Sequence, residues 1–304
     1  MKVFLTGATG FIGSFVTHLF CQNGWDVSAL VLPDENTWRI KDIKKDIHLI
    51  SGDIKEIDQY RREITGIKAD ICIHLAWFVQ PGKYWQAFDN VEILSASLNF
   101  FRLVADAGCK RFIGMGTCAE YDLSLGYLSE TSKLSPKSLY AASKLSFFYL
   151  MTELGKLTGM ETAWMRLFYP YGPKEDGKRL VPSVINGLIR KEPVKTTLGI
   201  QKRDYIFIED VAEAVFAISN SHLTGPVNIG SGEPVSIAEI VDQISLMMGG
   251  KDLIRAGEIP TPEDEPPIIY ADNLKLRSIG WEPRYNIGEG LRKTINWWQD
   301  NASL

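Results

Sequence analysis

Short apolar segments alternate with longer amphipathic ones through the first two-thirds of the chain. The short segments are apolar on both sides, which is typical of strands in a parallel sheet covered on both faces. They predict strands at residues 3–5, 26–32, 48–50, 71–75, 112–115 and 163–167. Because crossovers between parallel strands are right-handed, this order predicts an α/β chain of the Rossmann type, with a doubly wound parallel sheet.

The amphipathic segments predict helices between these strands and after them. Residues 11–22 follow the first strand, and residues 237–248 and 287–298 lie late in the chain. The segments 90–107 and 139–157 carry more apolar side chains than one face of a sheet requires. We therefore predict a homodimer that uses these two helices, with burial inside a single chain as the alternative.

The composition of the sequence changes beyond about residue 168, where prolines cluster and the predicted helices are separated by loops. This change predicts a smaller, mixed α/β C-terminal lobe. Residues 1–167, with a return segment at about 203–229, are assigned to the first domain. Residues 168–202 and 230–304 are assigned to the second lobe.

Composition and charge restrict the classes of partner. Hydrophobic residues make up 45% of the 304 positions and the net charge is -4, so the chain has no basic field for nucleic acid or an anionic membrane. With no apolar run near the roughly 20 residues of a membrane span, and no signal peptide at the start, a cytoplasmic location is expected. The 4 cysteines and 4 histidines lack paired or ligand spacing, so we expect free thiols and no metal.

A glycine-rich turn follows the first predicted strand immediately. Gly7 allows the tight turn, Gly10 lets the backbone approach a pyrophosphate, and Gly13 lets the next helix pack close to the strand. The N–H groups at the start of that helix, at Phe11 and Ile12, would attract the anion. In this strand–turn–helix setting, the turn predicts a bound dinucleotide, NAD or NADP, in the first domain.

The choice between the two dinucleotides depends on the end of the second strand. Val31 and Leu32 stand where an acid would bind the ribose hydroxyls of NAD, and the acidic Asp34 lies just beyond. Arg39 and Lys41 could fold back toward a 2′-phosphate. The missing acid favours NADP, with NAD as the alternative.

A second contact with the dinucleotide is expected after the third strand, at Asp53 and Ile54. The carboxylate of Asp53 would accept a hydrogen bond from the adenine amino group. Its alternative role is to cap the next helix, and the two roles are compatible.

Tyr140 and Lys144 lie four residues apart and therefore on one face of a predicted helix. A free tyrosine has a pKa of about 10, which makes it a poor base at neutral pH. A neighbouring lysine, with an oxidised nicotinamide close by, is expected to lower that pKa into the working range. Thr117 follows the fifth predicted strand, and its hydroxyl would orient the substrate oxygen. We predict that these three residues are catalytic.

These motifs, in this order, resemble the extended short-chain dehydrogenase/reductase family, in particular its nucleotide-sugar epimerase, dehydratase and reductase branch. The resemblance implies an enzyme that acts on a nucleotide-activated sugar bound in the second lobe, with Leu75, Ala76 and Trp77 at the cofactor. Trp77 and Trp85 would stack on the sugar, or else fill the core. The similar segments are Gly7, Gly10 and Gly13, residues 74–76, Thr117 with Tyr121, Tyr140 with Lys144, and residues 166–173, 203–211, 228–232 and 276–283.

Departures from the family pattern bear on the reaction. Cys118 and Ala119 stand where the 4,6-dehydratases carry Asp and Glu, so dehydration is disfavoured. Ala119 also replaces the cysteine of the reductase-epimerases that invert carbons 3 and 5. The expected reaction is the reduction of a 4-keto-6-deoxyhexose. A nucleotide-sugar epimerase with retained NAD is the alternative; a non-catalytic NAD(P)-sensing regulatory protein and an oxidoreductase of a plain ketone stay open.

The expected substrate contacts depart from the family as well. Tyr169 stands where relatives have an asparagine that donates to the diphosphate, and Pro262 stands where many have an arginine. The acidic segment 263–265 would repel a diphosphate if it were unpaired. Arg203 keeps its family position and would clamp a phosphate, with Arg255 as a possible substitute.

Overall fold

The computed structural model describes residues 1–301, which form two compact units. The first unit comprises Met1–Asp122, Lys133–Leu167 and Ala212–Val227, and the second comprises Leu123–Ser132, Phe168–Val211 and, of the described residues, 228–301. Two segments thus differ from the expected division, because residues 123–132 and about 203–211 belong to the second unit. The last three residues of the predicted lobe, 302–304, lie outside the described residues.

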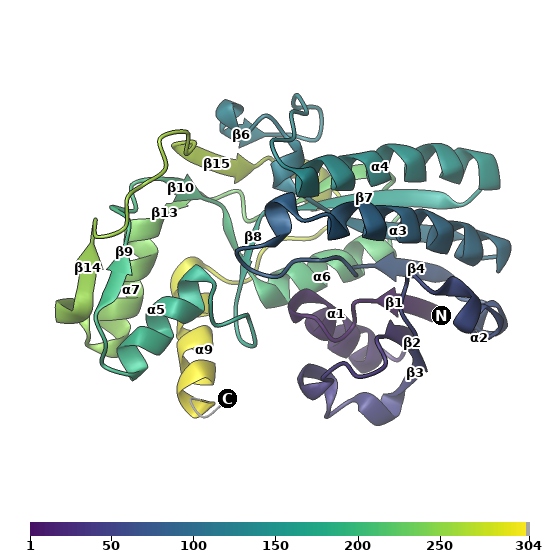
Figure 1. The fold of residues 1–304 in the computed structure, drawn as a ribbon, viewed down its shortest axis with the longest axis horizontal. Coiled ribbons are helices and arrows are strands. Elements are labelled where there is room, and N and C mark those ends of the chain that lie inside the picture. Colours follow the sequence, from purple (N-terminus) through teal and green to yellow (C-terminus); the bar gives the residue numbers. More distant parts are fainter. Residues whose placement is uncertain (302–304) are drawn as a thin grey trace. The chain divides into compact units, whose positions relative to one another are not determined.

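A seven-stranded sheet, the largest in residues 1–301, carries the first unit (Figure 1). Neighbouring strands pair in parallel from β3 through β2, β1, β4 and β5 to β7. Strands β2 and β3 are therefore added on one side of β1, and strands β4, β5 and β7 on the other side. This order confirms the doubly wound Rossmann-type sheet. In spatial order the strands are β12 (Gly225–Ile229), β7 (Glu161–Leu167), β5 (Arg111–Thr117), β4 (Ile71–His74), β1 (Lys2–Thr6), β2 (Asp26–Val31) and β3 (Ile47–Ser51).

The central strands are buried on both faces, as their continuous apolar runs predicted. Every residue of β1 after Lys2 is buried, and so is every residue of β5 before Thr117. Helices cover the sheet because each one presents an apolar side to it. Those helices are α1 (Phe11–Gln22), α2 (Arg61–Ile67), α3 (Asp89–Asp106), α4 (Leu139–Thr158) and α6 (Ile208–Ser219).

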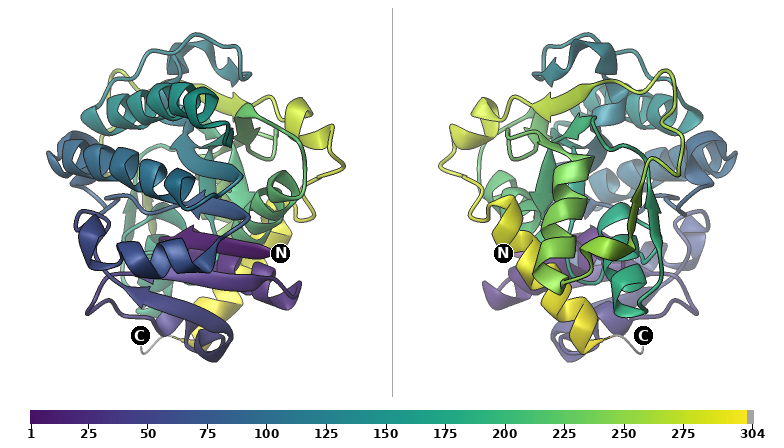
Figure 2. Two further views of the ribbon diagram at one scale, coloured as in Figure 1. Left: turned by 90° about the vertical axis from the view of Figure 1, so that its right-hand side faces the viewer. Right: turned by 90° about the vertical axis from the view of Figure 1, so that its left-hand side faces the viewer.

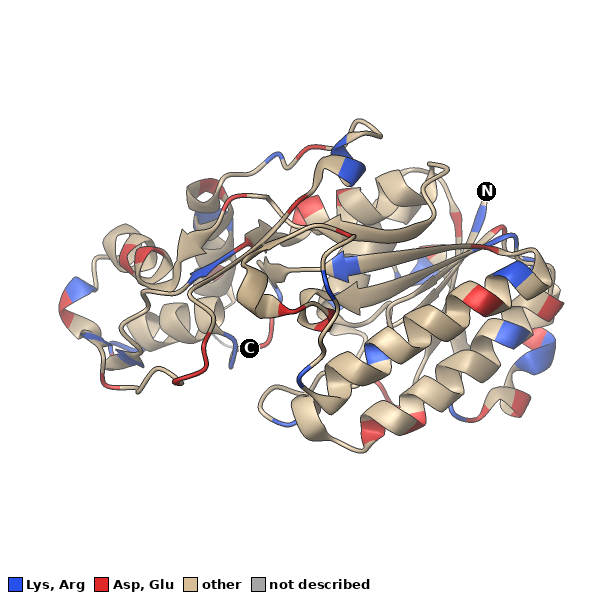
Figure 3. Ribbon diagram, turned by 90° about the horizontal axis from the view of Figure 1, so that it is seen from above, with Lys and Arg blue, Asp and Glu red and all other residues tan. Residues whose placement is uncertain are grey.

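Helices α3 and α4 lie side by side and cover one face of the sheet (Figure 2). Much of their apolar surface is buried in this chain, including Phe101, Phe147 and Met151. Val91 and Leu150 are 45% and 46% exposed, and most positions on both helices carry no charge (Figure 3). The homodimer through these helices stays a prediction.

The second unit has smaller sheets, formed by strands of two to four residues. One four-stranded sheet has the order β13 (Val235–Ser236), β10 (Lys202–Arg203), β15 (Ile268–Ala271) and β6 (Tyr127–Leu128). Two further pairs join β11 (Tyr205–Phe207) to β8 (Tyr169–Tyr171), and β14 (Ile254–Ala256) to β9 (Val194–Thr196). Its helices are α5 (Leu180–Ile189), α7 (Ile237–Met248), α8 (Leu274–Arg277) and α9 (Ile287–Asp300).

These pairings explain why the unit boundaries differ from the expected ones. Strand β6 pairs with β15, more than a hundred residues later in the chain, so residues 123–132 join the second unit. Strands β10 and β11 pair with β15 and β8 in the same way. Partners this distant in sequence leave no local pattern by which the boundary could be recognised.

Three further properties of the described residues concern membrane-spanning helices, cysteines and metal ions. Within residues 1–301 no helix is both long enough and apolar enough to cross a membrane. All four cysteines are free thiols. In the same part of the chain, no group of three or more His, Cys, Asp or Glu side chains is placed to hold a metal ion.

Candidate functional site

The glycine turn between β1 and α1 requires its glycines for two different reasons. Gly7 has a φ of +74°, and a Cβ there would come within 2.8 Å of the backbone nitrogen of Ala76. A Cβ on Gly13 would overlap the carbonyl oxygen of Gly7 and approach its carbonyl carbon to 2.7 Å. The turn therefore brings β1, α1 and the end of β4 into backbone contact, which side chains would prevent.

The start of helix α1 fits an anion such as a pyrophosphate. Gly10 is the N-cap residue, makes no side-chain capping bond, and a Cβ there would meet only the carbonyl oxygen of Gly7. No acidic side chain occupies the first turn, which contains Phe11 and Ile12. The first N–H groups of the helix and its positive dipole end are thus left for a ligand to satisfy.

The end of β4 is held in place by a buried histidine. His74 shares a hydrogen bond of 2.8 Å with Thr6 Oγ1 and one of 2.9 Å with Ser97 Oγ. Burial lowers the pKa of His74 to about 3, so the ring is neutral at physiological pH. Thr6 Oγ1 also accepts the N–H of Ala76, so Leu75 and Ala76 are fixed at the carboxyl edge beside Gly7.

The predicted adenosine contacts lie at the ends of β2 and β3. Leu32 and Asp34 are exposed beyond β2, and the guanidinium of Arg39 lies over the ring of Trp38 at 4.5 Å. Asp53 does not cap a helix, because the next short helix has Glu56 at its N-cap. The carboxylate of Asp53 accepts the N–H of Lys55 at 2.9 Å instead, and so stabilises a turn.

The structure brings Thr117, Tyr140 and Lys144 together in the first unit. Thr117 ends β5, and its side chain lies close enough to the phenol hydroxyl of Tyr140 to lower the pKa of the phenol. Tyr140 and Lys144 lie one turn apart on α4, and the ammonium of Lys144 donates to the carbonyl oxygen of Met115 at 2.7 Å. Helix α4 begins where it does because Ser138 caps it, accepting the N–H of Ala141.

That a lysine and an oxidised nicotinamide together make the phenol acidic stays a prediction, and in the protein chain itself burial dominates the pKa of Tyr140. Burial raises the pKa of Tyr140 above its ordinary value, and the charge of Glu120 and the nearby Tyr84 raise it further. The side chain of Thr117 acts in the opposite direction. Burial also lowers the pKa of Lys144 to about 7. The ammonium of Lys144 donates to the carbonyl oxygen of Met115, and burial is the largest influence on the pKa of the phenol.

Aromatic side chains surround Tyr140 and Lys144. The ammonium of Lys144 lies 3.9 Å from the ring centre of Trp77, a cation–π contact. Trp77 is held by a hydrogen bond from its indole N–H to Asn90 at 2.9 Å. Tyr84 and Trp85 meet the ring of Tyr140 edge-on, with ring centres 4.9 and 5.7 Å away. Trp77 thus contacts the lysine, while stacking of the 45% exposed Trp85 on a sugar stays a prediction.

The sequence analysis missed a buried ion pair beside Thr117. Glu120 and Arg166 have side chains that are 0% and 1% exposed, and Arg166 Nε donates to Glu120 Oε2 at 2.7 Å. The sequence did carry a signal, because Thr117 and Glu120 have the spacing of a capping box. The same spacing occurs in many loops, and the arginine partner is 46 residues away.

The expected substrate residues lie in the second unit. Arg203 is buried and forms an ion pair with Glu265, and its guanidinium carbon lies 5.9 Å from the ring centre of Tyr169. Glu265, the last residue of the acidic segment 263–265, is therefore paired with an arginine. Arg255 lies on a different sheet from Arg203, and its guanidinium donates to the carbonyl oxygen of Asp252 at 2.6 Å.

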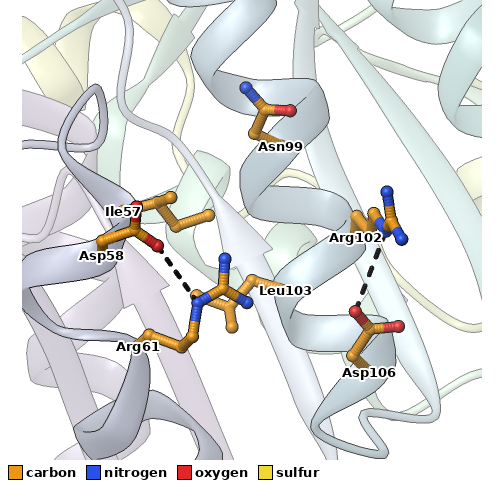
Figure 4. A pocket seen from close by; sticks show the side chains of 7 residues that line it. All are labelled: Ile57, Asp58, Arg61, Asn99, Arg102, Leu103 and Asp106. Atoms are coloured by element: carbon orange, nitrogen blue, oxygen red, sulfur yellow. Dashed lines mark hydrogen bonds and ion pairs between the residues drawn. The ribbon is translucent and has the colours of Figure 1, made fainter.

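A surface cavity of about 420 Å³ lies between α3 and the segment around α2 (Figure 4). Its charged side chains pair with one another, Arg61 with Asp58 and Arg102 with Asp106. None of the residues predicted to bind cofactor or substrate lines it. The cavity therefore adds nothing to the candidate site.

Comparison with known proteins identifies the class to which this fold and site belong. The model of the family described as "NAD dependent epimerase/dehydratase family" matches residues 3–230. The chain belongs to this family, which confirms the resemblance drawn from its motifs.

Individual relatives match the chain over nearly its whole length. It is 25% identical to a putative UDP-glucose 4-epimerase of Methanocaldococcus jannaschii, over 98% of this chain and 99% of that protein. It is 26% identical to a UDP-glucuronate 4-epimerase of Thermodesulfobacterium geofontis, over 99% and 97%. A Thermus thermophilus UDP-glucose 4-epimerase solved in complex with NAD has the same fold, with a TM-score of 0.88, 22% identity, and coverage of 99% and 100%.

Proposed function

We propose that this protein is an NAD-dependent nucleotide-sugar epimerase that inverts the configuration at carbon 4 of the sugar. The observation that carries the proposal is the grouping of Thr117, Tyr140 and Lys144 on the unit that also holds the glycine turn. The names of the two relatives, both 4-epimerases, favour this reaction over the net reduction expected from the sequence. The geometry itself supports reversible proton transfer at one sugar hydroxyl.

In this proposal each catalytic side chain has a separate task. Tyr140 takes the proton of the 4-hydroxyl when that carbon becomes a ketone, and returns it when the ketone is reduced from the opposite face. Thr117 hydrogen-bonds the same sugar oxygen and holds it beside the phenol. Lys144 places a positive charge on the same helix face, one turn from Tyr140.

The turn at Gly7, Gly10 and Gly13 would hold the diphosphate of the cofactor, as the uncapped start of α1 indicates. Bound NAD would accept and return the hydride and bring a positive charge near the phenol. That charge would oppose the effect of burial on the pKa of Tyr140. We favour NAD over the NADP expected from Val31 and Leu32, because an epimerase retains its cofactor and the family is described as NAD-dependent.

Net reduction of a 4-keto sugar by NADPH is the second candidate. The sequence Val31-Leu32, without the acid that would bind the ribose of NAD, favours it. Neither candidate reaction includes a dehydration, which the residues after Thr117 disfavour. Cys118 and Ala119 follow Thr117, and the carboxylate of Glu120 is bound by Arg166 and Trp164.

A product assay separates these candidates. We expect UDP-glucose or UDP-glucuronate to be converted to its 4-epimer by the purified protein, without any net change in absorbance at the wavelength of reduced nicotinamide. A reductase would instead consume NADPH in stoichiometric amounts with a nucleotide-linked 4-keto-6-deoxyhexose. Dinucleotide binding without turnover of either substrate would contradict both candidates and favour the regulatory protein.

We further propose that Arg203 binds the diphosphate of the substrate after Glu265 has moved aside. Glu265→Gln should then lower KM for the nucleotide sugar by about fivefold, because the anion no longer competes with a carboxylate for the guanidinium. Arg203→Ala should raise KM by roughly tenfold to a hundredfold. Steady-state kinetics measure both values.

Glu258→Gln is the matched control for this test. It neutralises another acid of the second unit, one that pairs with Lys195 at 3.2 Å. We expect its KM to equal that of the parent protein. If Glu265→Gln and Glu258→Gln changed KM equally, competition at Arg203 would be rejected.

A further inference from the structure

The turn after β5 contains a buried carboxylate that the proposed reaction does not use. Glu120 Oε1 accepts the backbone N–H of Thr117 at 2.9 Å, and Glu120 Oε2 accepts Arg166 Nε at 2.7 Å. The indole N–H of Trp164 lies 3.0 and 3.1 Å from the two oxygens. This one side chain therefore joins the turn at Thr117 to two residues of the neighbouring strand β7.

The glycines of strand β5 leave room for the side chains of Glu120 and Trp164. A Cβ on Gly116 would overlap both the carboxylate of Glu120 and the indole of Trp164, and a Cβ on Gly114 would overlap the same indole. Burying an ion pair gains little stability over an apolar side chain of similar size. Stability alone thus gives no reason for a charged pair in this place.

We propose that Glu120 is a positioning residue for Thr117, an inference that rests on the proposed function. The two residues cap each other, because the Thr117 hydroxyl accepts the N–H of Ala119 at 3.2 Å while Glu120 accepts the N–H of Thr117. The hydroxyl of Thr117 is left able to donate its proton in the direction of Tyr140 and the substrate oxygen. Arg166 and Trp164 hold the carboxylate so that it cannot turn away.

The charge of Glu120 also acts on the two titrating groups of α4. It raises the pKa of Tyr140, because a nearby anion disfavours the phenolate, and it raises the pKa of Lys144, because it favours the ammonium. Removing the charge is therefore expected to move both pKa values down. The other titratable or charged groups that face these three are Arg166, Tyr121, Cys118, Tyr84 and the neutral His74.

The test compares two substitutions of Glu120, which follows the end of β5, with one of Glu161, the first residue of the neighbouring strand β7. Glu120→Gln removes the charge, and Glu120→Asp keeps the charge but shortens the side chain. Glu161→Gln is the matched control, because it also removes a carboxylate that pairs with a buried arginine. That arginine, Arg111, is the first residue of β5. For each variant we would measure kcat, KM, the pH dependence of kcat, the thermal midpoint, and amide hydrogen exchange at Thr117.

Glu120→Gln is expected to lower kcat by roughly a hundredfold with little change in KM, as for misplacement of a catalytic group. The pH profile of its kcat should move to lower pH. Glu120→Asp should also lose kcat but keep the pH profile of the parent. Amide exchange at Thr117 should be faster in both variants, and Glu161→Gln should match the parent in kcat, pH profile and exchange.

If Glu120→Gln does not fold, the double variant Glu120→Gln/Arg166→Gln removes both buried charges and takes its place. The double variant is then expected to lose kcat and to exchange faster at Thr117. A folded variant with the kcat and the Thr117 exchange of the parent would overturn the inference. So would a loss of kcat no larger than that of Glu161→Gln. The exchange measurement needs no substrate, so it tests Glu120 even if the parent turns over no nucleotide sugar, which would contradict the proposed function instead.

Discussion

Tyr140→Phe is expected to lower kcat for the epimerisation by roughly a thousandfold, the size of effect that general acid–base catalysis supplies. The substitution removes only the phenol hydroxyl, which lies near the side chain of Thr117. The ring should keep its edge-on contacts with Tyr84 and Trp85, so the fold and the affinity for NAD should stay nearly unchanged. Product formation and NAD binding, measured on the same preparation, check the two expectations.

Tyr149→Phe is the control for this prediction. Tyr149 lies on the same helix, is 52% exposed, and loses the same hydroxyl group in the variant. We expect its kcat to equal that of the parent. Turnover by Tyr140→Phe at the rate of Tyr149→Phe would show that another group transfers the proton.

Gly13→Ala is expected to destabilise the protein by about 3 kcal/mol, at the upper end of the usual cost of an over-packed position. The new Cβ would overlap the carbonyl oxygen of Gly7, so α1 must move away from β1. Because the same movement displaces the N–H groups that would hold the diphosphate, NAD affinity should fall along with stability. Urea unfolding and NAD titration measure the two losses.

Gly66→Ala provides the comparison. Gly66 lies in helix α2, and a Cβ there would have no heavy atom within 4 Å. Alanine favours a helix over glycine by about 1 kcal/mol, so this variant should be as stable as the parent or slightly more stable. Equal stabilities of Gly13→Ala and Gly66→Ala would mean that the close approach of α1 to the turn is not required.

Burial is the largest influence on the pKa values of both Tyr140 and Lys144. The spacing of Tyr140 and Lys144, together with a bound nicotinamide, predicts an acidic phenol, whereas burial in the protein chain itself raises the pKa of Tyr140. Lys144 itself has a pKa lowered to about 7, against the charge of Glu120, which raises it. The ammonium that the pair needs is therefore lost as the pH rises through the neutral range, unless ligands add to the charges around it.

The sequence by itself determined the features that depend on neighbouring residues. Continuous apolar runs marked the strands of the large sheet, because such strands are buried on both faces whatever their partners are. The glycine spacing from Gly7 to Gly13 marked the turn, and the four-residue spacing of Tyr140 and Lys144 placed both on one helix face. Each of these patterns acts over a single turn, strand or helix, so each can be recognised without the fold.

Only the tertiary structure decided what those side chains meet. Lys144 donates to the carbonyl of Met115, 29 residues away, and Glu120 pairs with Arg166, 46 residues away. The same holds for the two-residue strand β6, which exists only because β15 pairs with it. These contacts depend on which distant segments the folded backbone brings together and on how deeply it buries them. Neither the contact partners nor the depth of burial can be recognised from neighbouring residues in the sequence.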